Sequence, residues 1–278
     1  MNRGEWIRAS EFSQMRWLLF FLLWVPAWAQ VPSFDYPVLE PTPEEQRVLK
    51  LASEFMAGYY RRLGYRLPST VRIHLFPDLQ SHVAYQEQLA ELNRTPYSPP
   101  PRIVLNPFYS RSRMEICTWR TANLQRTLIH ETSHALFSFS QDPPTWLNEG
   151  LAELFANMSF PGGKPRVEPD PKQILELTHG FDPGRLGGAV MRVADLSYEA
   201  FHQQAIRRDN YRDAWALVYF LHRTGKLEGM IPRILANREP GQKHSQVLSL
   251  AYLGGLQALT RQMELFYRSE FKELTGSL

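Results

Sequence analysis

Cysteine is almost absent from this sequence: Cys117 is the only one in 278 residues. A single cysteine cannot form an internal disulfide, and without a CxxC spacing the chain has neither a zinc knuckle nor a thioredoxin-like redox site. We therefore expect Cys117 to be a buried, structural side chain. Any metal site in this protein has to be built from histidine and carboxylate ligands.

The sequence also lacks a large excess of charge of either sign. Its 31 lysines and arginines nearly balance 28 acidic residues, which gives a net charge of only +3. Nucleic-acid-binding domains usually carry a clear basic surplus, so we expect no nucleic-acid partner. With 44% hydrophobic and 21% charged residues, the composition is that of a globular protein with a sizeable core.

Long hydrophobic runs are missing as well, apart from a short one near the N-terminus. From Met15 the chain reads MRWLLFFLLWVPAWAQ, with an apolar run over residues 17–25 and an A-x-A cleavage pattern at 27–29. That run is shorter than the roughly 20 residues that cross a bilayer, so it predicts a cleaved signal peptide over residues 1–29. We therefore expect an exported bacterial protein, periplasmic or extracellular, without a stable membrane span. Met15 is an alternative start.

The remaining chain shows both strand and helix patterns, which predicts an α+β fold. Thr42, Pro43 and Glu45 have the pattern of a capping box that starts a helix reaching Gly64. Further expected elements are strands at 70–76, 102–106 and 114–119 and helices at 78–93, 121–139, 146–158, 198–204, 211–223, 227–237 and 245–278. A proline- and glycine-rich segment at 160–171 divides a domain at 30–160, with a small sheet and packed helices, from a mainly helical part at 161–278.

The segment LIHETSHALF carries the clearest chemical signal. It places His130 and His134 four residues apart, on one face of an expected helix. This spacing lets two imidazoles reach one metal ion, although two ordinary histidines on an amphipathic helix are the alternative. Zinc accepts neutral histidine nitrogens and in hydrolases keeps a position for water. Glu131 is then expected to act as the general base on that water.

A third ligand is expected from the next helix, which begins in TWLNEGLAE after a Pro-Pro turn. At about 1.5 Å per residue, an antiparallel pair of helices brings Glu149 opposite His134. One turn later, Glu153 is placed to hold a ligand imidazole by its outer nitrogen. Spacing alone leaves the converse assignment open, with Glu153 as the ligand, and both acids could also be ordinary solvated side chains.

HETSH followed by WLNEGLAE resembles the gluzincin metallopeptidases, in which a glutamate on the helix after HExxH is the third zinc ligand. The longer stretch PPTWLNEGLAELF is more similar to the smaller bacterial peptidase MA-like proteins, including the DUF1570 group. Segments 194–201 (ADLSYEAF) and 210–221 (NYRDAWALVYFL) look like downstream parts of that group. The resemblance covers roughly residues 70–225. It implies a zincin-like catalytic domain at 30–160, a helical part at 161–278 that completes the cleft, and a Zn²⁺ cofactor.

In the related M1 aminopeptidases a tyrosine stabilises the oxyanion, and Tyr211 occupies the similar position here. A buried packing role for this aromatic is an equal alternative. Asp213-Ala214 replaces the Lys-Gly of that family, and no G-x-M-E-N segment is present, so aminopeptidase specificity is not implied. Three arginines near Tyr211 could hold a substrate carboxylate or lie on a solvated helix face: Arg208, Arg212 and Arg223. Six other histidines show no ligand spacing and are expected to be structural or exposed: His74, His82, His179, His202, His222 and His244.

The sequence therefore predicts an exported zinc-dependent peptidase that acts on a peptide or protein substrate. Zinc would activate water, Glu131 would accept its proton and pass it to the leaving amine, and Tyr211 would stabilise the oxyanion. Two alternatives use the same site: a catalytically inactive zincin-fold binding protein of the bacterial envelope, and a hydrolase of peptidoglycan cross-links. An inactive protein does not need Glu131, so the sequence favours catalysis.

Overall fold

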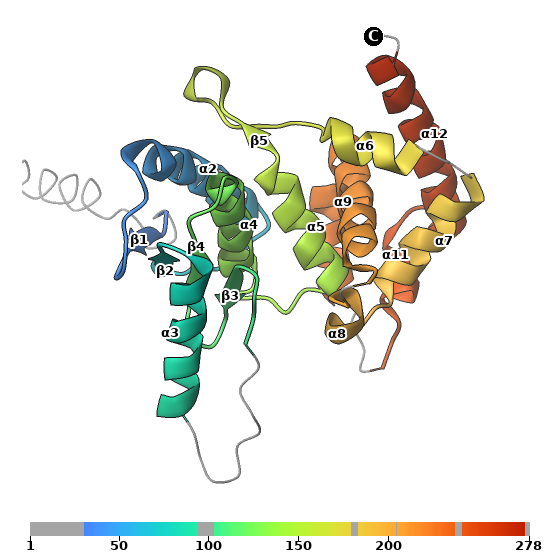
Figure 1. The fold of residues 1–278 in the computed structure, drawn as a ribbon. Coiled ribbons are helices and arrows are strands. Elements are labelled where there is room, and N and C mark those ends of the chain that lie inside the picture. Colours follow the sequence, from blue (N-terminus) through green and yellow to red (C-terminus); the bar gives the residue numbers. More distant parts are fainter. Residues whose placement is uncertain (1–30, 94–102, 179–182, 204, 237–240, 276–278) are drawn as a thin grey trace, which may run out of the picture. The chain divides into compact units, whose positions relative to one another are not determined.

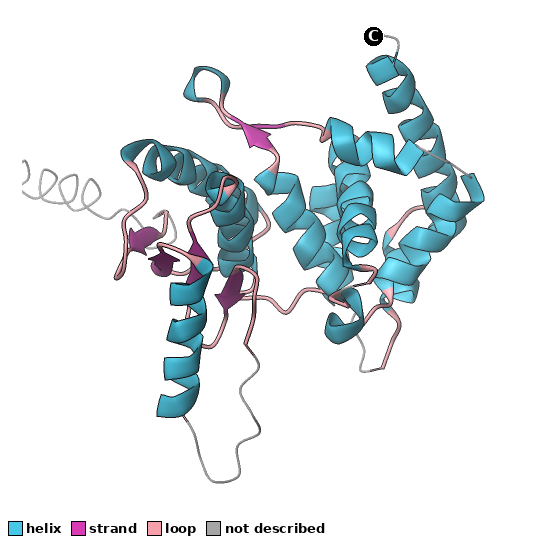
Figure 2. Ribbon diagram, in the orientation of Figure 1, coloured by secondary structure: helices cyan, strands magenta, loops and turns pink. Residues whose placement is uncertain are grey.

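The computed structural model describes residues 31–93, 103–178, 183–203, 205–236 and 241–275. Within these ranges, a small mixed sheet and a larger set of helices form a mixed α/β fold (Figure 2). The signal peptide expected at residues 1–29 lies outside the described residues. In the part of the chain that is described, no helix is both long enough and apolar enough to cross a membrane.

The main sheet has the strand order β1-β2-β4-β3. Its strands are β1 (Ser33–Asp35), β2 (Thr70–Phe76), β3 (Phe108–Ser110) and β4 (Glu115–Trp119). Strands β1 and β4 run parallel to β2, whereas β3 runs antiparallel to β4. Because side chains alternate along a strand, Val71, Ile73 and Leu75 share one face of β2, and all three are buried. That face packs against helix α4 (Leu124–Phe137).

Helix α4 lies between the sheet and the other helices. Its Leu128 and Ala135 belong to the apolar cluster under the sheet, whereas Leu136 and Phe137 belong to a second, larger cluster. Helix α2 (Pro43–Arg62) holds it from that second side, where Tyr60 stacks on Phe137 with 5.1 Å between ring centroids. The orientation of α4, and therefore of the face that carries HETSH, is fixed by packing on two sides.

The larger cluster continues through the helices that follow α4, up to Tyr267. Helix α5 (Thr145–Ala156) lies between α4 and α9 (Arg207–Arg223) and contacts both (Figure 1). The other described elements are α3 (Leu79–Leu92), β5 (Met158–Ser159), β6 (Arg166–Val167), α6 (Pro171–Thr178), α7 (Pro183–Ala194), α8 (Tyr198–Phe201), α10 (Leu227–Ala236), α11 (His244–Ala251) and α12 (Gly255–Thr275). Since α5 and α9 carry Glu149 and Tyr211, their contact decides how these two side chains lie.

A glycine makes the close approach of α5 and α9 possible. A Cβ atom added to Gly150 would lie 2.5 Å from Val218 Cγ2 and 2.6 Å from the backbone oxygen of Ala214, both on α9. Backbone atoms cannot move away as a flexible side chain can, so any larger residue at this position would push the two helices apart. Gly150 also follows Glu149 directly, so the close packing of the two helices affects the position of this candidate site residue.

We expect Gly150→Ala to lower the free energy of unfolding by about 1–3 kcal/mol, as overpacking of a tight core does. Gly58→Ala is the matched control, because the nearest atom to its added Cβ, Arg62 Nη1, is 3.9 Å away. In the interior of α2, alanine should stabilise the protein by about 0.5–1 kcal/mol relative to glycine. Denaturant unfolding of both variants measures the difference, and equal stability would contradict the close approach.

Most sequence expectations for the elements are confirmed, including the capping box, in which the Thr42 backbone N donates to Glu45 Oε2 at 2.6 Å. The strand expected at 102–106 is wrong for residues 103–106, and the edge strand is β3 instead. The reason is that the Gln86 side chain bonds both the backbone N and O of Val104, at 2.8 Å each. These two bonds take the place of a strand partner.

Helix α6 and the strands β5 and β6 were not expected from the sequence, and three further differences have a clear physical reason. Strand β1 forms in the proline-rich lead-in, where its backbone pairs with β2 and needs no side-chain pattern. Helix α7 contains three glycines, yet Val190, Val193 and Ala194 bury one face of it in the larger cluster. The helix expected at 245–278 is instead two helices, because Gly254 and Gly255 have φ of +88° and +70°.

Candidate metal centre

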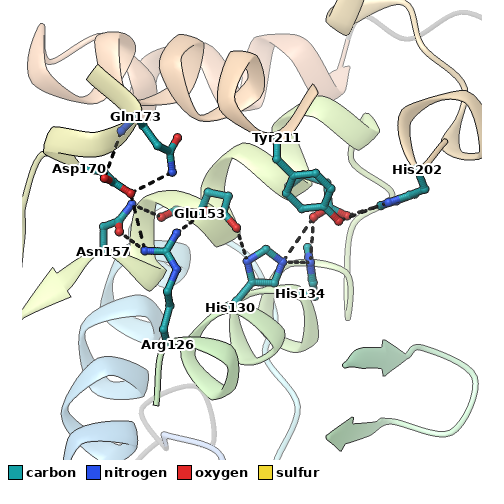
Figure 3. A network of polar contacts seen from close by, with 10 residues as sticks. Arg126, His130, His134, Glu153, Asn157, Asp170, Gln173, His202 and Tyr211 are labelled. Atoms are coloured by element: carbon teal, nitrogen blue, oxygen red, sulfur yellow. Dashed lines mark hydrogen bonds and ion pairs between the residues drawn. The ribbon is translucent and has the colours of Figure 1, made fainter. Parts of the chain in front are cut away.

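Helix α4 presents His130 and His134 on the same face, one helical turn apart (Figure 3). Their side chains are only 13% and 10% exposed, although imidazoles are usually found at least partly in water. The two Nε2 atoms are 3.1 Å apart. Both rings therefore direct the same nitrogen toward one point between them.

Helix α5 adds a carboxylate oxygen to this pair. Glu149 Oε2 lies 3.4 Å from Nε2 of His130 and 3.4 Å from Nε2 of His134. The three donor atoms thus form a triangle with sides of 3.1, 3.4 and 3.4 Å. In a tetrahedral zinc site with bonds of about 2.0–2.1 Å, two ligand atoms are about 3.3–3.4 Å apart. His130, His134 and Glu149 could therefore hold a metal ion.

The electrostatics of this group favour a bound cation. Burial by itself raises the pKa of Glu149, but the His134 and His130 rings hold that pKa well below its usual value. Burial likewise lowers the pKa of His130, yet Glu149 and Glu153 hold it well above the usual value. Glu149 Oε2 is fully buried without a hydrogen-bond partner among the described residues. A buried acceptor of this kind is costly unless a positive charge satisfies it.

Glu153 lies on the other side of the His130 ring. Its Oε1 is 3.1 Å from Nδ1 of His130, while its Oε2 accepts a hydrogen bond of 2.5 Å from Nη2 of Arg126 (Figure 3). Asn157 also contacts both residues, since it receives a hydrogen bond from Arg126 and donates one to the backbone oxygen of Glu153. This arrangement orients the ring so that Nε2, not Nδ1, faces the shared point.

We expect Glu153→Gln to weaken zinc binding by about 10–100-fold, which is the usual cost of removing the partner of a ligand imidazole. The glutamine has the same shape but no charge, so it favours the tautomer with a proton on Nδ1 less strongly than the carboxylate does. Competition with a fluorescent zinc chelator measures the affinity. Asp170→Asn is the matched control, because Asp170 contacts Arg126 at 4.0 Å but not His130, and an equal loss in that variant would contradict the role of Glu153.

Glu131 follows His130 on α4 and is 6% exposed. It does not belong to the group of three donor residues found among the described residues. Burial raises the pKa of its carboxyl, while the charges of His130 and His134 act in the opposite direction. A carboxylate with a raised pKa, held next to the candidate metal ligands, is suited to accept and return a proton.

Tyr211 reaches the same site from α9 (Figure 3). Its ring stacks near that of His130, with centroids 6.2 Å apart, and its hydroxyl lies 3.3 Å from Nδ1 of His202. Burial and the charge of Glu149 raise the pKa of the phenol well above its usual value. The hydroxyl therefore keeps its proton and can donate a hydrogen bond.

His202 is a site residue that the sequence reasoning missed. Its Nε2 lies 3.5 Å from Oε1 of Glu149, whereas His130 and His134 contact Oε2 of the same carboxylate. It follows the short helix α8 directly, and nothing in its spacing to His130 or Glu149 could have indicated the contact. Only the packing of this segment on α5 brings it there.

The three arginines considered near Tyr211 are engaged in ion pairs. Arg208 pairs with Glu176, and Arg223 lies 3.4 Å from Glu270. Arg212 pairs with Asp209 at 3.0 Å and with Asp213 at 2.9 Å. Cys117 is buried and free, as expected from the sequence. Of the other histidines, His74 and His82 are buried around the sheet, and His179 lies outside the described residues.

Comparison with known proteins gives one family match. Residues 125–240 match the model of a family described as a protein of unknown function (DUF1570). The matched segment contains His130, His134, Glu149, Glu153 and Tyr211, so the candidate metal centre falls wholly within it. No curated protein and no solved structure matches the chain.

Proposed function

We propose that this protein is a zinc-dependent peptidase of the gluzincin type, with a zincin-like arrangement of its active-site helices. The observation that carries the proposal is the triangle of donor atoms from His130, His134 and Glu149, together with the buried Glu131 beside it. Two imidazole nitrogens and one carboxylate oxygen are the ligand set of catalytic zinc sites, which leave a position for water. The signal-peptide pattern at residues 1–29 supports export.

Each residue has a distinct part in the proposed reaction. A bound zinc ion would supply Lewis acidity and make water a nucleophile at neutral pH. Glu131 accepts the proton of the attacking water and returns it to the leaving amine. Tyr211 donates a hydrogen bond to the developing oxyanion, and its raised pKa keeps the donor proton in place. Glu153 fixes the His130 ring.

The buried Glu131 is the observation that favours catalysis over metal-dependent binding alone. Glu131 is 6% exposed and is not one of the three candidate ligands, and no hydrogen bond or ion pair of its carboxylate is found among the described residues. The positive charges that act on it are those of His130, His134 and Arg207, which all line or adjoin the candidate site. A buried ionisable group with a shifted pKa is typical of active sites. A hydrolase of peptidoglycan cross-links would use the same residues, so that alternative differs only in its substrate.

The test is cleavage of a mixed peptide library by the mature protein, followed by mass spectrometry. We expect about one equivalent of zinc in the purified protein, loss of cleavage after treatment with a zinc chelator, and recovery when zinc is added back. Full zinc content without cleavage of peptides or of cross-linked peptidoglycan fragments would contradict the proposal. Cleavage of the fragments alone would assign the second substrate.

A further inference from the structure

A cavity of about 680 Å³ lies beside the candidate metal centre. Glu153 and Tyr211 form part of its wall, and both contact the His130 ring. The rest of the wall comes from the first residues of α4, the start of α6 and the first turns of α9. Ligand sites in proteins usually have volumes of about 300–1,000 Å³, so the cavity can hold part of a peptide next to the reacting group.

The wall of this cavity carries more positive than negative side chains. Five cationic residues line it, against three carboxylates. Three of the five are neutralised, because Arg126 pairs with Glu153, Arg208 with Glu176, and Arg212 with two aspartates. The two others are Arg207 and Lys172, and for neither of them is an ion pair found within the described ranges. Arg207 and Lys172 are therefore the cations of this wall that a negatively charged ligand could pair with.

Arg207 is the better placed of these two cations. It is partly buried, and its guanidinium carbon lies 5.3 Å above the centre of the Tyr211 ring. Its charge is close enough to act on the Glu131 carboxyl as well as on the Tyr211 phenol. One part of the guanidinium also interacts with the Tyr211 hydroxyl, and the other N–H donors of its planar fork can bind a carboxylate.

We propose that Arg207, assisted by Lys172, binds a carboxylate of the peptide substrate in this cavity. The inference rests on the proposed peptidase function, because carboxylates are the anionic groups that peptides carry. The carboxylate has two sources, the C-terminus of the substrate or an acidic side chain near the scissile bond. Arg207 is thus a residue that determines specificity, and the site favours peptides with a negative charge on one side of that bond.

Four pools of acetylated hexapeptides test the inference. They carry either a free carboxylate or an amide at the C-terminus, combined with either Glu or Gln at one central position. Binding to the zinc-loaded Glu131→Gln protein is measured by ultrafiltration and mass spectrometry, which needs no cleavage. Cleavage rates of the protein without substitutions are measured on the same peptide pools. A failure of catalysis and a failure of carboxylate binding can then be distinguished.

We expect tighter binding of one carboxylate pool by about 10–100-fold over its neutral partner, which is typical of a charged hydrogen bond. Arg207→Gln should abolish that preference. Arg223→Gln should keep it, and this control is closely matched, since Arg223 also lies above a tyrosine ring of α9, at 5.7 Å from the centre of Tyr219. Which pool is favoured identifies the source of the carboxylate.

Two results would overturn the inference. One is equal binding of all four pools to the protein with Arg207 intact. The other is an equal loss for charged and neutral peptides in Arg207→Gln, which would mean that Arg207 only supports Tyr211. If carboxylate peptides bind in an Arg207-dependent way but no pool is cleaved, the proposed peptidase function fails while the anion site stands.

Discussion

Glu131→Gln is expected to leave zinc binding intact and to lower the rate of peptide cleavage by about 100- to 10,000-fold. This is the usual contribution of a positioned general acid–base group. Glutamine has nearly the same shape as glutamate but cannot accept the proton of the attacking water. Because Glu131 is not one of the three candidate ligands, metal content and activity separate in this variant. Metal analysis and cleavage rates on the peptide library measure both.

The matched control is Glu54→Gln, which makes the same change at an exposed position of α2. It should have full activity. If Glu131→Gln retained more than about a tenth of the cleavage rate, the general base would have to be a different group. If instead it lost its zinc, Glu131 would be a ligand, and the proposed division of roles would be wrong.

His134→Ala and Glu149→Ala are each expected to remove zinc from the purified protein. Each takes one of three donor atoms away, so the affinity should fall by more than the roughly 10–100-fold that an outer partner costs. Cleavage should be lost with the metal. Elemental analysis of the folded variants, after dialysis against a weak chelator, is the measurement.

Two substitutions at comparable residues control for folding, and both should retain zinc. His222→Ala removes a histidine near the C-terminal end of α9, and Glu228→Ala removes a carboxylate that pairs with Arg62. Full zinc content in Glu149→Ala combined with loss in Glu153→Ala would exchange the roles of the two acids. Zinc content near zero in the unmodified protein, even after reconstitution, would contradict the metal centre itself.

Most of the candidate metal centre could be predicted from the sequence, because its residues lie close together along the chain. His130 and His134 are one helical turn apart, so their common face follows from helix geometry alone. The short Pro-Pro turn before α5 makes α4 and α5 neighbours, which brings Glu149 to both histidines and Glu153 to His130. The capping box at Thr42 is a local signal of the same kind, and the structure confirms it. The strand expected at 70–76 is also confirmed, although His74 and Phe76 on its second face are buried as well.

Contacts between segments that are far apart in the sequence could not be predicted in this way. His202 lies next to Glu149 only because α8 packs on α5, and no sequence spacing encodes that contact. Arg207 lies next to Tyr211 because the two are four residues apart on α9, but the helix expected from the sequence began only at Tyr211. The missing strand at 103–106 has the same cause, since Gln86, 18 residues from Val104, takes its hydrogen bonds.

By itself, the sequence determined the type of chemistry: two histidines, a neighbouring glutamate and a following acidic helix, on elements whose periodicity fixes which side chains share a face. The tertiary structure decided which nitrogen and which oxygen face one another and that His202 joins the site. It also decided that Arg207 and Tyr211 line a cavity beside that site. The physical reason is that helical periodicity acts over a few residues, whereas the approach of α5 to α9 depends on core packing, including the absence of a side chain at Gly150.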